Sequence, residues 1–256
     1  MPILVRAGPP DRAVGATAKA HDRFLSPPLK ARSRLSVSPS SVKGMSTPAP
    51  ARNRVRPLGD VVAAPGRGAW MGNRGRLHDG AGTREVRRHH VGRAWITCAL
   101  TFRDRRVRQW DPGHYTPLFF LDEAVSFAAG HRPCAECRRP AFTAFRDLVA
   151  VAAGVDRPSA PELDRLLHSE RWDPSRRARR LHAYPWADLP DGAFVLLDDE
   201  AVLVAGDGLL PWRPDNTYAV QPVPRPGTGR AELLTPPSVV RALRAGLPVQ
   251  VGAPGG

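Results

Sequence analysis

Two of the three cysteines in this chain are spaced as a metal-binding pair. Cys134 and Cys137 stand in the segment Pro-Cys-Ala-Glu-Cys. Two thiolates three positions apart on a tight turn can point at one ion, and zinc is the ion we expect there. Cys98 supplies a third sulfur. Because three cysteines and one histidine form a closed structural site, we expect a Cys3His centre with Zn²⁺ as its cofactor.

The fourth ligand has to be chosen among several histidines. We expect His78, because it stands at the end of a predicted strand, where a turn begins. His131, His114, His89 and His90 remain alternatives, since any neutral imidazole can coordinate zinc. The predicted metal ligands are therefore Cys98, Cys134, Cys137 and His78.

A Cys-x-x-Cys pair also has other interpretations. The two thiols can form a redox dithiol, or they can be small apolar packing residues. Zinc deaminases of nucleobases place a glutamate two positions after their first ligand and later carry Pro-Cys-x-x-Cys. Here the glutamate position after Cys98 holds Leu100. Because leucine cannot carry a proton, the sequence disfavours deaminase activity.

The elements that must position the cysteines can be read from local patterns. Residues 95–103 alternate, so that Ile96, Cys98, Leu100 and Phe102 share one face of a predicted strand. Asp122 is placed to cap a helix over 123–129 that Gly130 ends. A second helix begins at Pro140. The turn at 134–137, called the knuckle below, therefore lies between two helices.

The remaining patterns complete an α+β prediction. Ser159 to Glu162 reads as a capping box before another helix. Residues 57–78 read as short strands between glycine turns, and residues 186–256 as short strands with a helix over 236–245 and a final strand near 248–251. We predict a small zinc-knuckle lobe of short antiparallel strands and helices, and a small β-rich C-terminal lobe. The predicted boundaries are 51–155 for the zinc lobe, 156–185 for a helix and basic linker, and 186–256 for the C-terminal lobe.

The first 50 residues differ in composition from the rest. All three lysines lie within the first 44 residues, which contain neither Trp nor Tyr. Such a segment buries too little apolar area to offset chain entropy, so we predict a disordered leader over 1–50 and a natural start at Met45. Three cysteines form no disulfide framework, and neither a secretory h-region nor a membrane span is visible. These features predict a cytoplasmic protein without a membrane partner.

The basic charge indicates an anionic partner. The net charge is +14, and residues 45–256 keep +8 because 30 arginines face 22 acidic residues there. Guanidinium groups bind phosphates through paired hydrogen bonds, so we predict contact with DNA. The basic run at 176–180 is predicted to be an exposed linker. The predicted DNA-contacting residues are Arg74, Arg76, Arg132, Arg138 and Arg139.

Residues 119–140 resemble the N-terminal zinc-binding domain of the Ada family of adaptive-response DNA repair proteins. The resemblance is carried by an aromatic strand end at 119–121, an alanine-rich helix at 124–129, and then Gly130, His131, Arg132, Pro133, Cys134, Cys137, Arg139 and Pro140. It implies that Cys134 and Cys137 ligate zinc and that two further cysteines come from an upstream strand. Only Cys98 is present there, so the methyl-acceptor chemistry of that family is not carried over. Segments around GNRGRLH and PGHYTPLFFLDEA also resemble an uncharacterised bacterial family over most of 51–250, which implies that both lobes form one unit.

The leading functional prediction is a zinc protein with a structural metal and an arginine-rich face that contacts DNA, which favours a non-enzymatic role but leaves the question of an enzyme open. A metal-dependent hydrolase or nuclease is the first alternative. It rests on the histidines and acids near the site in sequence, which are His78, His89, His90, His114, Asp79 and Asp111. The second alternative is a protein-interaction module in the C-terminal lobe.

Overall fold

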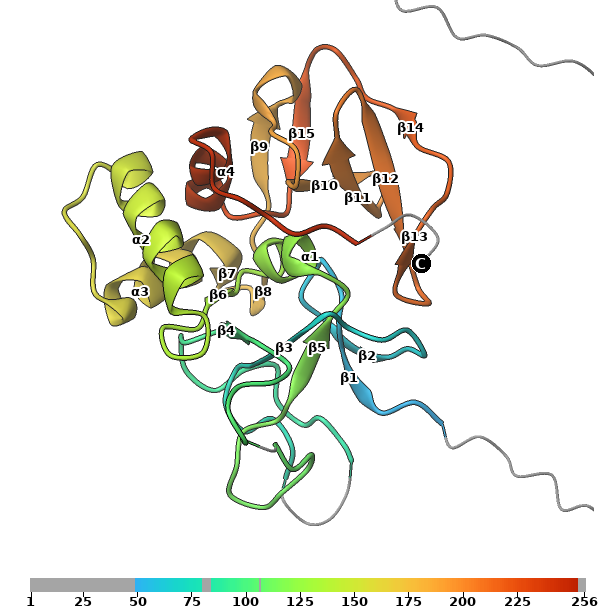
Figure 1. The fold of residues 1–256 in the computed structure, drawn as a ribbon. Helices are drawn as coiled ribbons and strands as arrows, with labels where there is room; N and C mark the ends of the chain where they lie inside the picture. Colours follow the sequence, from blue (N-terminus) through green and yellow to red (C-terminus); the bar gives the residue numbers. More distant parts are fainter. Residues whose placement is uncertain (1–48, 80–83, 106, 253–256) are drawn as a thin grey trace, which may run out of the picture. The chain divides into compact units, whose positions relative to one another are not determined.

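The computed structural model describes residues 49–79, 84–105 and 107–252, so residues 1–48 of the predicted leader lie outside the described part. The described residues belong to one compact unit and form an α+β fold (Figure 1). None of the helices in this part of the chain is both long and apolar enough to cross a membrane. The compact unit formed by the described residues is not divided at 155 or 185. The predicted lobe boundaries at these positions therefore stay predictions.

The first sheet has six short strands in the order β2-β1-β5-β3-β4-β6. It is mixed rather than purely antiparallel, since β1 pairs with β5 and β4 with β6 in parallel. Residues 99–131, which include β5 and the helix at 123–128, connect β4 to β6, and a long connection of this kind can bring a strand back in the same direction. The strands are β1 Arg52–Val55, β2 Val61–Ala63, β3 Trp70–Asn73, β4 Ile96–Cys98, β5 Leu118–Phe120 and β6 Arg132–Pro133.

The second sheet has seven strands in the order β13-β12-β11-β10-β15-β9, with β14 beside β12, and all of its pairs are antiparallel. The hairpin between β10 and β11 turns at Asp198 and Asp199, which both have positive φ, as one type of two-residue turn between twisted strands requires. A small β7–β8 hairpin precedes it. The strands are β7 Trp172–Asp173, β8 Ala178–Arg179, β9 His182–Pro185, β10 Phe194–Leu197, β11 Glu200–Ala205, β12 Gly208–Arg213, β13 Thr217–Tyr218, β14 Val223–Pro224 and β15 Arg230–Leu233.

The helices begin where the sequence predicts them. The Asp122 side chain accepts a hydrogen bond of 2.8 Å from the Val125 N–H, and Ser159 and Glu162 form the predicted capping box. Gly130, with φ of 88°, ends the first helix. The four helices are α1 Glu123–Ala128, α2 Arg139–Ala153, α3 Ala160–Arg171 and α4 Pro237–Arg244, and Trp186–Asp188 forms one 3₁₀ turn.

Helix α1 is buried along its whole length and packs against strands of both sheets. One apolar cluster contains Phe120 of the first sheet, Val125 of α1 and Phe194 of the second sheet. Asp122 joins the same region, since its Oδ2 accepts hydrogen bonds of 2.8 Å from both Tyr218 Oη and the Gly252 N–H. An enclosed helix needs small or apolar side chains and partners for any polar ones. Helix α1 meets this with its alanines and with hydrogen bonds from Arg138 to Glu123 and from Ser126 to the Glu123 carbonyl.

Three local predictions differ from the structure. The strand predicted over 95–103 ends at Cys98, because its neighbour β6 is two residues long and the knuckle then turns away from the sheet. Residues 248–251 form no strand, and Gln250 instead hydrogen-bonds with α1. The basic run at 176–180 is not wholly exposed, because Arg179 turns inward and donates to carbonyl groups.

Candidate metal centre

The parallel pair β4–β6 brings the cysteines together. Thr97 is paired with Pro133 across the two strands, and the Cys134 N–H donates a hydrogen bond of 2.9 Å to the Thr97 carbonyl. Cys98, the last residue of β4, therefore lies beside the first cysteine of the knuckle. Chain segments far apart in sequence thus present their sulfurs at the same edge of the first sheet.

The three Sγ atoms of Cys98, Cys134 and Cys137 all lie within 4.8 Å of one another. A tetrahedral zinc site with bonds of about 2.3 Å has its sulfurs about 3.8 Å apart, so the donor set fits a zinc ion after a small inward adjustment. All three side chains are half-buried. Across residues 49–79, 84–105 and 107–252, no other three His, Cys, Asp or Glu side chains come as close together.

Main-chain hydrogen bonds shape the knuckle around the first sulfur. The Glu136 N–H points at Cys134 Sγ over 3.4 Å, and the Arg138 N–H donates to the Cys134 carbonyl over 3.2 Å. An N–H group aimed at sulfur stabilises a thiolate, which is the form that binds metals. The turn therefore prepares Cys134 for coordination before any cation arrives.

The three thiols influence one another's ionisation. The hydrogen bond from Cys98, together with main-chain N–H groups, lowers the pKa of Cys134 to about 5. The same hydrogen bond to Cys134, with burial, raises the pKa of Cys98, and burial raises the pKa of Cys137. The hydrogen bonds around Cys134 thus favour its thiolate over the thiolates of Cys98 and Cys137. A divalent cation would displace the remaining thiol protons.

His78 does not belong to this group. Its Nδ1 lies 2.7 Å from Thr116 Oγ1 and its Nε2 lies 3.1 Å from the Asp111 carbonyl, so the buried ring links two loop segments. The strand register explains the difference from the predicted Cys3His set. Because β3 runs antiparallel to β4, residues that follow Asn73 continue past Ile96, at the end of β4 opposite Cys98. The structure thus assembles three of the four predicted ligands.

The alternative histidines also lie outside the sulfur group. His131 is fully buried, and its Nε2 accepts a hydrogen bond of 3.1 Å from Arg74 Nε. His114 pairs with Asp111 at 3.2 Å. The Nδ1 atoms of His89 and His90 lie 3.0 Å apart, beside Trp95 and Trp172. Each of these histidines therefore contacts other residues and not the three sulfurs.

A cavity of about 200 Å³ adjoins the sulfurs, and all three cysteines contribute to its wall. The predicted strand face holds only as far as the strand extends. Ile96 and Cys98 line the cavity from β4, whereas Leu100 and Phe102 line it from the loop that follows, together with Ala99, which the alternation placed on the other face. Sequence reasoning missed the rest of the wall apart from the two knuckle cysteines, because it comes from β3 and from loops that share no periodicity with residues 95–103. The other lining residues are Met71, Asn73, Arg105, Val107, Tyr115, Cys134, Glu136 and Cys137.

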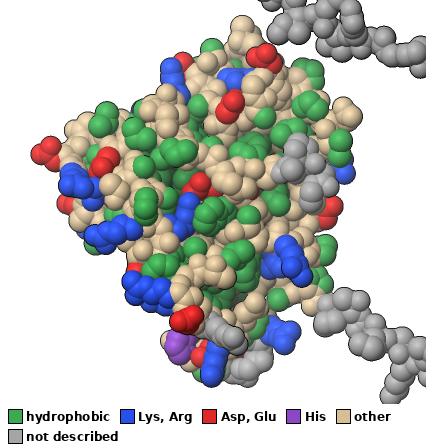
Figure 2. Space-filling model, viewed as in Figure 1, with side chains coloured by type: hydrophobic (Ala, Val, Ile, Leu, Met, Phe, Trp, Pro, Cys, Tyr) green, Lys and Arg blue, Asp and Glu red, His purple; other side chains and the backbone are tan. Residues whose placement is uncertain are grey.

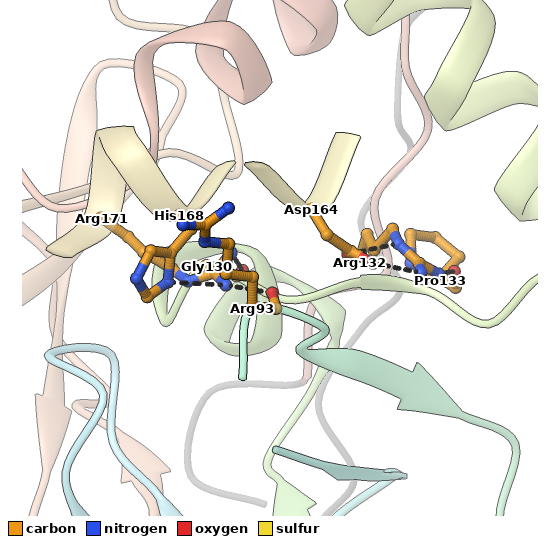
Figure 3. Close-up of polar contacts among 7 residues, drawn as sticks. All are labelled: Arg93, Gly130, Arg132, Pro133, Asp164, His168 and Arg171. Carbon is orange, nitrogen blue, oxygen red and sulfur yellow. Dashed lines mark hydrogen bonds and ion pairs between the residues drawn. The ribbon is translucent and has the colours of Figure 1, made fainter. Parts of the chain in front are cut away.

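Three of the five arginines predicted to contact DNA are buried. Arg132 binds both carboxylate oxygens of Asp164 at 2.8 and 2.9 Å (Figure 3). Arg138 pairs with Glu123 and stacks over Trp70. These arginines, with Arg74, are at most 8% exposed, so the prediction that they form a DNA-binding face is wrong. A buried cation needs a partner, and each of these found one inside the protein.

Arg74 belongs to an arginine cluster with Arg171 and Arg179. The guanidinium carbons of Arg74 and Arg171 lie 3.9 and 4.2 Å from the Trp95 ring centroid. Burial is the main cause that lowers the pKa of Arg74 to about 9 and that of Arg179 to about 10.

The cluster binds the carbonyl groups at the end of α1. Arg171 reaches from α3 and donates to the Gly130 and Arg93 carbonyls at 2.8 and 2.6 Å (Figure 3), and Arg179 donates to the carbonyls of Ala128 and Ala129. Cations at the C-terminal end of a helix offset its partial negative charge. The sequence showed no signal for this role.

Arg76 and Arg139, the other two predicted DNA contacts, are exposed. On the face drawn in Figure 2, the basic side chains are dispersed among acidic and apolar ones instead of forming one patch. Charge alone therefore marks no nucleic-acid interface on this face.

No family model matches the chain, and neither the curated proteins nor the solved structures give a match. The resemblances to the Ada zinc-binding domain and to an uncharacterised bacterial family stay expectations. They rest on the residues quoted for them and on nothing else.

Proposed function

We propose that the chain binds one zinc ion through Cys98, Cys134 and Cys137. The observation that carries this proposal is the close approach of three sulfurs, all within 4.8 Å, from two separate segments. Thiolates are soft ligands that favour zinc over hard cations such as magnesium or calcium. A redox dithiol would need only the knuckle pair, so the third sulfur favours metal binding over redox chemistry.

Metal analysis of the purified full chain tests this proposal. We expect one zinc per chain under reducing conditions, and a loss of about 100-fold in affinity for Cys98→Ser and Cys134→Ser. That magnitude follows from sharing roughly 10–16 kcal/mol of zinc binding among four ligands. His78→Gln is the matched control, because it removes the imidazole that the sequence predicted as a ligand. An unchanged zinc affinity of Cys98→Ser, measured by competition with a chelator, would refute the three-sulfur site.

Zinc at this position would act first on the fold. It would join the end of β4 to the knuckle that leads into α2, two segments whose direct strand pairing covers only Ile96–Arg132 and Thr97–Pro133. Metal binding to a preorganised site adds directly to folding free energy, since the unfolded chain has no such site. We therefore expect that zinc raises the melting temperature of the wild type and not that of Cys98→Ser.

Other functions have less support from the described contacts. The hydrolase alternative required histidines and acids around the metal, but His78, His114 and Asp111 contact one another and not the sulfur group. Contact with DNA stays a prediction that now rests on Arg76 and Arg139 and on the basic charge. A role of the C-terminal lobe in protein interaction also stays a prediction.

A further inference from the structure

The three sulfurs leave one coordination position to be filled. Zinc in proteins takes four ligands in a tetrahedral arrangement. Within the part of the chain that the structure describes, no fourth His, Cys, Asp or Glu atom joins the cluster. Glu136, the nearest acid in sequence, is turned toward Arg105 and forms two hydrogen bonds with it, at 2.8 and 3.2 Å. The fourth ligand therefore has to come from outside this group.

The cavity beside the sulfurs gives an external ligand a place to bind. Its volume of about 200 Å³ is smaller than the roughly 300–1,000 Å³ of pockets for drug-sized ligands, so it suits a molecule of only several heavy atoms. Apolar side chains form much of its wall, namely those of Met71, Ile96, Leu100, Phe102 and Val107. A ligand that fills it is small, and its carbon atoms would contact these apolar side chains, while Asn73, Arg105, Tyr115 and Glu136 line the rest of the wall.

The donor set determines which atom of that ligand meets the ion. Three thiolates make a soft site, and soft sites favour sulfur over oxygen donors. A fourth thiolate would complete a set of four sulfurs, which is one of the closed arrangements that zinc adopts in proteins. We propose that the cavity admits a small apolar thiol, whose sulfur binds as the fourth ligand after its proton is released to solvent. This inference rests on the zinc site proposed above and adds the class of ligand.

Cobalt substitution tests the inference without an activity assay. The full chain is kept reduced with a phosphine and is loaded with one Co²⁺ per chain. Propanethiol is then added stepwise, and the intensity of the sulfur-to-cobalt charge-transfer band is recorded. We expect this band to grow by about a third, as a fourth thiolate joins three. Propanol and propionate, which share the carbon chain but offer oxygen, should leave the band unchanged.

A variant of the cavity wall makes the test specific. Leu100 lines the cavity and is 49% exposed, so Leu100→Trp can narrow the cavity without disturbing the core. We expect it to raise the half-saturating thiol concentration by about tenfold while Co²⁺ binding stays intact, because overfilling a small site costs binding energy. Leu181→Trp is the matched control, since Leu181 is 38% exposed and does not line the cavity.

The possible outcomes separate the two proposals. A cobalt spectrum of three thiolates that propanethiol does not change overturns the thiol site and leaves the metal site standing. A cobalt spectrum that shows four protein ligands before any thiol is added also overturns the thiol site and leaves the metal site standing. Failure of the wild type to bind Co²⁺ or Zn²⁺ overturns both proposals. If propionate changes the cobalt spectrum as much as propanethiol does, the external ligand is a carboxylate and the proposed preference for sulfur is wrong.

Discussion

The sulfur site and the arginine cluster are both assembled from distant segments, but their surroundings differ. At the sulfur site, Cys98, Cys134 and Cys137 are half-buried and line a cavity. In the arginine cluster, Arg74 and Arg171 are fully buried and donate to main-chain carbonyl groups. The sulfur site leaves its thiol groups accessible from the cavity, whereas the arginine cluster uses its guanidinium groups to stabilise the fold. The type and charge of a residue therefore indicate its function only when the burial of its side chain and its hydrogen-bond partners are also known.

Arg132 connects the neighbourhood of the sulfur site to α3, the helix that also carries Arg171. It lies in β6, two positions before Cys134, and its buried guanidinium pairs with Asp164 on α3. Removing one partner of a buried pair leaves an uncompensated charge, so we expect Asp164→Ala to lower the free energy of unfolding by about 3–5 kcal/mol. Chemical denaturation measures the loss.

The control for this change is Asp147→Ala. Asp147 is exposed and pairs with Arg146, and an exposed carboxylate in such a pair contributes little to stability. The comparison between the two regions also requires that folded Asp164→Ala protein keeps its zinc. Loss of zinc from protein that circular dichroism shows to be folded would mean that the ion pair belongs to the metal centre.

A substitution at Gly130 tests how tightly Arg171 of the arginine cluster packs against the end of α1. The φ of Gly130 is 88°, and an added Cβ would lie 2.3 Å from Arg171 Cδ. We expect Gly130→Ala to cost about 3 kcal/mol, because the left-handed conformation and the overpacking each contribute. Thermal unfolding measures it.

Gly154→Ala isolates the conformational part of that cost. Gly154 ends α2 with φ of 65°, and nothing lies within 4 Å of its added Cβ. The expected cost is about 1–2 kcal/mol, from the backbone alone. Equal costs at the two glycines would show that the contact with Arg171 is loose.

Acid should destabilise the region around the arginine cluster. Burial and then Arg74 lower the pKa of His131 well below its usual value, and similar causes lower the pKa of His89 to about 3 and that of His168 to about 4. The native state therefore binds fewer protons than the unfolded state, in which histidine titrates with a pKa near about 6.5. Stability is full above that pH and falls as the pH is lowered through it, most of all for the fully buried His131.

The measurement is the free energy of unfolding between pH 7 and 5, in chelator so that zinc release does not contribute. His131→Asn keeps a polar side chain but cannot be protonated. It should therefore lose less stability on acidification than the wild type. An identical pH dependence in the two proteins would show that His131 is not kept neutral by its surroundings.

Local signals predicted the elements around the sulfur site well. The Asp122 cap, the Gly130 stop and the Ser159–Glu162 capping box depend on neighbours within a few positions, and the structure has all three. The closeness of Cys98 to the knuckle also followed, because three sulfurs in one chain suggested one site. These predictions needed no knowledge of tertiary packing.

The fourth ligand and the arginine roles required information that the sequence lacks. His78 is excluded by the direction of β3 against β4, and strand register is a long-range property. Arg132 and Arg138 are buried because Asp164 and Glu123 approach from other elements. No local pattern distinguishes an arginine with such a partner from one that faces solvent.

The smallest expected effect concerns the two exposed arginines of the predicted DNA-binding set. Arg76 and Arg139 can reach a phosphate, whereas the buried arginines cannot do so without unfolding. If DNA binds near the knuckle, Arg139→Ala and Arg76→Ala should each reduce the slope of log affinity against log salt by about 1, since each removes one phosphate contact. Fluorescence anisotropy with duplex and single-stranded oligomers measures these slopes. Arg213→Ala, an exposed change on β12 of the second sheet, should leave the slope unchanged, and an equal effect of all three variants would indicate attraction by net charge instead of a defined face.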